Sequence, residues 1–132
     1  MEWPIWRNSN YGSWDGVGWS DNTSGPGEIG NMVVVSVKNG NATESYNSMM
    51  HLAVGDEVDI TTCSTVFAYV VTTPPSSRTM IANDTWPLDP NPDEPGAAPT
   101  VAQLTMIAIP QLDPPVRNNY VGFAELTGTT PR

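Results

Sequence analysis

One apolar run constrains this fold more than any other part of the sequence. Residues 32–37 read Met-Val-Val-Val-Ser-Val. Valine favours extended structure, because branching at Cβ restricts its side chain in a helix. A run that is apolar at successive rather than alternate positions is typical of a strand covered on both faces. We therefore expect residues 32–37 to form a strand inside the domain.

Proline and glycine argue against a helical chain. The sequence holds 13 Pro and 11 Gly, which interrupt helices and favour short strands joined by turns. Apolar runs or an apolar alternation with polar residues predict further strands, at residues 57–62, 65–72, 101–109 and 119–126. Spacing supports one short helix, within residues 43–52. The expected fold class is therefore all-β.

The chain has the size of a single domain, with 132 residues. We expect an irregular Trp- and Gly-rich segment at residues 1–31 to wrap a β-domain at 32–126, followed by a tail at 127–132. A long Pro- and Asp-rich connection spans residues 74–100, with a short element near Ile81. The tryptophans either pack against the sheet or form a contact surface; these interaction candidates are Trp3, Trp6, Trp14, Trp19 and Trp86.

Charge and motif content exclude several classes of function. The formal net charge is −9 with only five Lys and Arg, too few to neutralise a phosphate backbone, so we expect no nucleic-acid partner. Cys63 is the only cysteine, which precludes an internal disulfide. No run approaches the ~20 apolar residues of a membrane span, and the start lacks the features of a signal peptide. Phosphate-binding Gly loops and metal-binding His pairs are also missing, so we expect no cofactor.

Short motifs follow one another along the chain in a particular order. They are Gly16-Val-Gly-Trp19, Gly25-Pro-Gly-Glu-Ile-Gly-Asn31, Gly55-Asp-Glu-Val58 and Leu104-Thr-Met-Ile-Ala-Ile-Pro110, followed by Arg117. None is specific alone, but in this order and spacing they resemble the sortases, especially the actinobacterial housekeeping type. The resemblance covers residues 15–126. It implies an antiparallel-rich β-barrel of seven or eight short strands with one or two short helices.

The resemblance also assigns positions to the family's catalytic residues. Sortase chemistry uses a cysteine thiolate that attacks the substrate carbonyl, a histidine that moves the proton and an arginine that steadies the oxyanion or substrate. By position the histidine falls on Val37, the arginine after it on Lys38, the cysteine on Ile109 and the distal arginine on Arg117. Arg117 should pair with a local carboxylate or with backbone carbonyls, or retain some anion recognition. We expect no catalytic residues and a chain that is not an enzyme.

Other residues offer weaker chemical alternatives. Cys63 and His51 could be parts of a relocated site, but nothing in their spacing brings them together, and a lone cysteine usually packs. Oxygen ligands recur every second residue in a weak calcium candidate made of Asp89, Asn91 and Asp93. That pattern is incomplete, because Thr100 stands where a bidentate glutamate belongs. The same residues also suit a solvated acidic loop.

A sortase-like frame without its nucleophile predicts a non-enzymatic structural or interaction module. Its partner would be a protein: further copies of the chain or a larger shell. The resemblance implies an N-terminal membrane anchor, whereas this chain begins on the domain, so we expect a virion component of an actinobacterial phage, either a capsid decoration or a tail protein. The alternatives are a bacterial cytoplasmic pseudo-sortase that binds a sorting-signal peptide or regulates a sortase, and a divergent transpeptidase or hydrolase that uses Cys63 or acidic residues.

Overall fold

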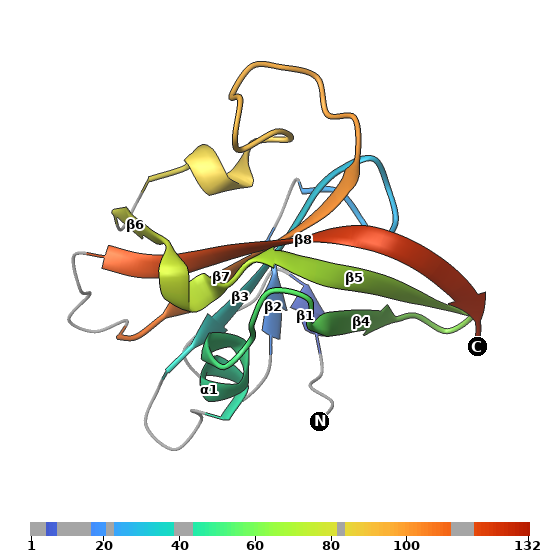
Figure 1. Cartoon of the computed structure of the whole chain (residues 1–132), viewed down its shortest axis with the longest axis horizontal. Coiled ribbons are helices and arrows are strands. Elements are labelled where there is room, and N and C mark those ends of the chain that lie inside the picture. Colours follow the sequence, from blue (N-terminus) through green and yellow to red (C-terminus); the bar gives the residue numbers. More distant parts are fainter. Residues whose placement is uncertain (1–4, 8–16, 21–22, 39–43, 82–83, 112–117) are drawn as a thin grey trace.

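A computed structural model describes residues 5–7, 17–20, 23–38, 44–81, 84–111 and 118–132, with only the backbone for 5–7. The strands form one eight-stranded sheet that curls on itself (Figure 1). In chain order the elements are β1 (Ile5–Arg7), β2 (Val17–Trp19), β3 (Gly30–Val37), α1 (Glu44–Met50), β4 (Glu57–Thr61), β5 (Thr65–Thr73), the 3-10 helix η1 (Pro75–Ser77), β6 (Thr79–Ile81), the 3-10 helix η2 (Trp86–Leu88), β7 (Ala102–Ile109) and β8 (Asn118–Pro131). The expected all-β fold is confirmed.

The sheet is mostly antiparallel, and its order is β1-β2-β3-β7-β8-β5-β4, with β6 also paired to β8. Parallel pairing occurs between β1 and β2 and between β3 and β7. Within the described residues β1 and β4 are thus the outer strands. The segment expected to wrap the domain contributes β1 and β2, which extend the sheet beyond β3.

β3 and β7 lie in the middle of the sheet. Their parallel ladder runs without interruption from Gly30 opposite Ala102 to Val37 opposite Ile109. Every residue of β3 is buried, as the unbroken apolar run predicted. The strand expected at residues 32–37 is therefore confirmed, and it begins earlier, at Gly30.

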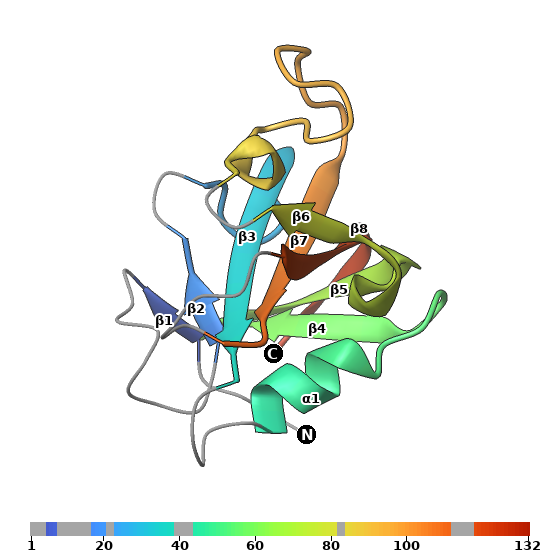
Figure 2. The same cartoon turned by 90° about the vertical axis from the view of Figure 1, so that its left-hand side faces the viewer.

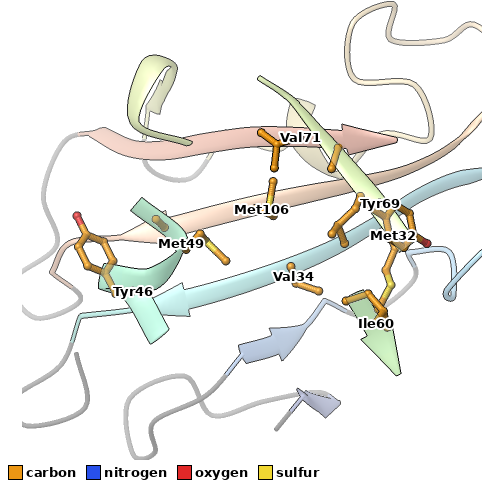
Figure 3. Packing of buried hydrophobic residues seen from close by; sticks show 11 residues of the cluster. Met32, Val34, Tyr46, Met49, Ile60, Tyr69, Val71 and Met106 are labelled. Carbon is orange, nitrogen blue, oxygen red and sulfur yellow. The ribbon is translucent and has the colours of Figure 1, made fainter. Parts of the chain in front are cut away.

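One face of this ladder carries the main core cluster. Figure 3 shows Met32 and Val34 of β3 with Met106 of β7, packed against residues of the hairpin and of α1. The labelled partners are Ile60, Tyr69, Val71, Tyr46 and Met49. The strands expected at residues 57–62 and 65–72 are present as β4 and β5, which pair as a hairpin that turns near Cys63.

Helix α1 closes one end of the sheet (Figure 2). It presents Ser45, Tyr46 and Met49 to the interior, and a hydrogen bond of 2.7 Å joins the buried hydroxyls of Ser45 and Ser36. Such a bond satisfies groups that would otherwise be buried without partners. Across the described residues no helix is long and apolar enough to cross a membrane.

The Pro-Gly-Glu segment before β3 is a turn held by two side chains. Gly27 has a φ of 75°, a left-handed conformation that favours glycine. The carboxylate of Glu28 accepts a hydrogen bond from the Gly25 N–H at 3.0 Å. The hydroxyl of Tyr69, on β5, accepts one from the Gly27 N–H at 2.8 Å. The turn is thereby tied to the main core cluster.

The expected tail at residues 127–132 is wrong, because β8 continues to Pro131. Its second half pairs with the start of β5, from Leu126 opposite Tyr69 to Pro131 opposite Thr65, across a register shift. The sequence here has no apolar alternation and therefore looked irregular. Thr nevertheless suits an extended backbone, and the ladder to β5 satisfies its polar groups.

Gly122 should be essential to the packing of β8. A Cβ added there would lie 2.6 Å from the backbone N, Cγ and Cδ of Pro75 in η1, and the backbone cannot yield easily. We expect Gly122→Ala to lower the free energy of unfolding in urea by about 1–3 kcal/mol. Gly128→Ala, on the same strand with nothing within 4 Å, is the control and should change it by less than about 0.5 kcal/mol. Equal losses would contradict the clash.

Tyr69 should make the fold sensitive to alkali. Burial raises the pKa of its hydroxyl above the ordinary 10.0, against a smaller lowering by the Gly27 N–H. The folded protein then keeps a proton that the unfolded chain loses, so the free energy of unfolding falls as pH rises past about 10. Tyr69→Phe should cost about 1 kcal/mol at pH 7 by losing the hydrogen bond, but flatten the decline measured by urea unfolding between neutral and alkaline pH. An unchanged decline would refute this role.

Candidate functional site

The second face of the β3–β7 ladder is also apolar. Side chains alternate along a strand, so Val33, Val35 and Val37 point opposite to Met32 and Val34. They form a second cluster with buried residues of β6, β7 and β8, namely Met80, Ile107, Val121 and Phe123. Trp86 and Ile109 pack against this second cluster. The two faces of one ladder thus serve two separate clusters.

Val37 and Ile109 form the last pair of this ladder. The N–H of Lys38, the next residue, donates to the carbonyl of Ile109 at 2.9 Å, which fixes the two strand ends together. Only 6% of Val37 is exposed, and Ile109 is half-buried. The two residues to which the resemblance assigns the histidine and the cysteine are therefore neighbours. Neither side chain can exchange a proton or act as a nucleophile.

A covering segment, residues 78–81 and 84–88, follows β5; it contributes Met80 to the second cluster and packs Trp86 against it. Arg78 lies with its guanidinium carbon 4.6 Å from the ring centroid of Trp86 and 5.1 Å from that of Phe123. Such cation–π contacts typically stabilise by about 0.5–1 kcal/mol each at exposed sites. Arg78 also donates to the carboxylate of Asp93 at 3.3 Å, an exposed pair that adds little energy. Arg78 therefore links the cover to the loop beyond η2.

The side chain of Asn31 binds the backbone of the η2 segment, at Pro87 and Asp89. Its side-chain amide donates to the carbonyls of Pro87, at 2.7 Å, and Asp89, at 2.9 Å, and its side-chain oxygen accepts a hydrogen bond from the Thr105 hydroxyl. Only 2% of Asn31 is exposed. A buried amide with both donors and its acceptor paired fixes backbone position strongly. Asn31, from the Gly-Asn motif, thus fastens η2 to the central ladder.

Cys63 lies far from this ladder end. It is exposed in the turn between β4 and β5, two residues before Thr65, which pairs with Pro131 of β8. Ala108, beside Ile109, pairs with Tyr120 at the other end of β8. At about 3.3 Å per residue, roughly 35 Å of strand separates Tyr120 from Pro131.

His51 and Lys38 lie near opposite ends of α1. His51 is exposed after the last helical turn, which its N–H closes by donating to the Asn47 carbonyl at 3.1 Å. Lys38 lies near the first turn, with its ammonium 6.0 Å from the ring centroid of Tyr46. None of the described contacts joins His51 to Cys63, so the structure does not assemble the relocated pair.

Two of the three residues of the calcium candidate already take part in other interactions. The Asp93 carboxylate faces Arg78, and the Asp89 carbonyl faces Asn31. No group of three or more His, Cys, Asp or Glu side chains is arranged to hold a metal ion within the described ranges.

Several of the residues predicted to make contacts are not among those that the structure describes. Trp3, Trp14 and Arg117 are not among the described residues, and for Trp6 only the backbone is, paired with Gly18. Trp19 is half-buried against the main core cluster and donates from its indole N–H to the Thr23 hydroxyl at 3.0 Å. A contact role for any tryptophan stays a prediction.

The chain is similar to known proteins both in sequence and in fold. A family model described as the sortase domain matches residues 1–127. No curated protein matches the chain. Among solved structures, sortase E from Streptomyces avermitilis is 24% identical with a TM-score of 0.79, over 98% of this chain and 80% of that one. The SrtA sortase from Actinomyces oris is 21% identical with a TM-score of 0.79, over 98% and 73%. Sortase A from Listeria monocytogenes is 16% identical with a TM-score of 0.71, over 97% and 80%.

These structural likenesses show a shared fold, and the family model adds a match in sequence along nearly the whole chain. The chain is therefore a member of the sortase family.

Proposed function

We propose that this sortase-family domain is a non-enzymatic interaction module. The observation that carries the proposal is the pair that ends the β3–β7 ladder, Val37 and Ile109. The family resemblance puts the proton-transferring histidine and the nucleophilic cysteine at these positions. Two aliphatic side chains supply neither function, and the single cysteine lies near the far end of β8.

The cover over this face supports the same proposal. Met80 belongs to the second cluster and Trp86 packs against it. Arg78 lies over the rings of Trp86 and Phe123, and Asn31 binds η2. A face that is filled with apolar residues along the ladder suits a rigid scaffold better than a cleft that admits a peptide.

For the setting we propose the virion of an actinobacterial phage, with the domain as a capsid decoration or tail protein in many copies. The missing chemistry supports it, because a domain that cannot join peptides to a cell wall has no need to be kept there. Capsid or tail genes beside its own, and its recovery by mass spectrometry from purified particles, are the expected findings. Neighbouring cell-wall genes would favour a bacterial pseudo-sortase that binds sorting signals.

The protein should not process sorting-type peptides. Loss of a catalytic nucleophile or base typically costs ~10⁴-fold or more in rate. We expect a quenched fluorescent peptide with a sorting-type motif, with or without an amine acceptor, to be cleaved no faster than in buffer. A thiol-directed probe should label Cys63 at the rate of an ordinary exposed thiol.

Cys63→Ala is the matched control for that experiment. Turnover by the natural sequence that disappears in this variant would establish a relocated thiol enzyme and end the proposal. Saturable peptide binding without turnover would instead support the pseudo-sortase alternative. Turnover retained in the variant would point to a different nucleophile and would equally contradict a non-enzymatic role.

Asn31→Ala should loosen the cover over the second cluster. The substitution leaves the Pro87 and Asp89 carbonyls without their donor, so we expect a loss of about 2–4 kcal/mol in the free energy of unfolding. Amide hydrogen exchange should accelerate most in residues 84–101. Exposure of the second cluster should also increase binding of a hydrophobic dye.

Gln103→Ala is the control, because Gln103 reaches the same network only through a long hydrogen bond of 3.4 Å to the Thr105 hydroxyl. It should leave exchange in residues 84–101 within about twofold and cost less than about 1 kcal/mol. If Asn31→Ala accelerated exchange evenly over the whole domain, Asn31 would not be a specific fastening of this loop.

A further inference from the structure

Strand β4 ends the sheet on the side of the hairpin. In the sheet order it follows β5, and within the described residues it pairs with no other strand. A strand with one unpaired edge offers a row of backbone donors and acceptors to an added strand. Whether this edge is usable depends on which residues direct their backbone groups outward.

The hydrogen bonds between β4 and β5 show which backbone groups point outward. The Val71 N–H donates to the Asp56 carbonyl, and the Thr62 N–H donates to the Thr65 carbonyl, both at 2.9 Å. Bonded residues alternate with unbonded ones along an antiparallel pair. The backbone N–H and C=O groups of Val58 and Ile60 are in phase with these bonds and therefore point toward β5. The outward-directed backbone groups belong to the remaining residues of β4, which are Glu57, Asp59 and Thr61, and no described interaction uses them.

The same residues carry the charge of this edge. Glu57, Asp59 and Thr61 share one face of β4, where all are exposed, while Ile60 points into the main core cluster. A hydrogen bond with Asp59 and the charge of Asp59 raise the pKa of Glu57. The two carboxylates thus lie close enough to disfavour each other's charge, which a cation placed beside them would relieve.

A second copy of the chain fits this edge poorly. Antiparallel pairing of two β4 edges centred on Asp59 would place the two Asp59 side chains opposite each other, and like charges at directly opposed positions are destabilising. The chain as a whole carries −9 with only five cationic side chains to offset it. Charge complementarity therefore favours a partner that is cationic.

We propose that the free edge of β4 binds an extended, cationic segment of a partner protein by strand addition. Glu57, Asp59 and Thr61 would pair their backbone N–H and C=O groups with the segment. Lysine or arginine at alternate positions would lie on the same face as the two carboxylates. The proposal does not depend on whether the domain is an enzyme, so a peptide-cleaving activity would leave it standing.

The test uses the whole domain and a capped peptide of about eight residues that alternates lysine and threonine, a length that spans one strand. Its counterpart carries glutamate in place of lysine. Titration followed by NMR gives the dissociation constant, and amide hydrogen exchange reports the site. We expect the lysine peptide to protect the amides of Glu57, Asp59 and Thr61, with the amides of Val58 and Ile60 unchanged, and the glutamate peptide not to bind.

Two variants separate the backbone from the charge. Thr61→Pro removes one outward N–H without touching the ladder to β5 or either carboxylate, and should weaken binding about fivefold or more. Glu57→Gln with Asp59→Asn removes the charge and keeps the backbone, and should weaken binding by a similar factor. The matched control, Asp84→Asn with Glu94→Gln, removes the same charge from exposed residues elsewhere and should have little effect.

Several outcomes would overturn the proposal. Equal weakening by the control pair, with no effect of Thr61→Pro, would reveal diffuse attraction to an acidic protein. Peptide binding without protection of the three outward amides would place the site elsewhere. Protection of those amides by concentration alone, with a dimer in sedimentation, would assign the edge to a second copy. If Thr61→Pro fails to fold, the exchange pattern of the natural sequence still decides.

Discussion

The parallel pairing of β3 with β7 is the contact on which the rest of the domain depends. Its ladder is unbroken from Gly30 to Val37, and β3 is buried along its whole length. Parallel neighbours cannot be joined by a tight turn, so the intervening chain must leave the sheet and return. That path contains α1, the β4–β5 hairpin and the covering segment with η2. The central pairing therefore dictates where every later element can lie.

Register within this ladder decides the environment of each central side chain. Successive residues of β3 belong alternately to the main core cluster and to the second cluster. A shift by one residue would exchange the two sets. Val37 and Ile109 therefore share the second face because of the ladder and not because of their own chemistry. The surroundings of that position therefore follow from the register of the ladder.

The strands with strong local patterns could be predicted from sequence, and those held by partners could not. The valines of residues 32–37 and the alternation at 57–62 are properties of the segments themselves. The extension of β8 to Pro131 depends on β5, and no local pattern signals it. Asn31 looked like a turn residue of a family motif, yet its hydrogen-bond partners lie more than fifty positions away, at Pro87 and Asp89. The cation–π contacts of Arg78 with Trp86 and Phe123 could not be predicted, because the sequence around an isolated arginine does not indicate which aromatic rings lie beside it in the fold.

Burial of Val37 within the second cluster limits which side chains this position can take. Val37→His would place an imidazole in the apolar second cluster, which disfavours its charged form, while Ile109→Cys alone would pair with Val37, which cannot take up the thiol proton. Each single step would disturb the packing before the other could confer any benefit. Substitutions at this strand-end pair are therefore costly to the core, whereas the exposed edge of β4 is a place where side chains can change with little effect on packing.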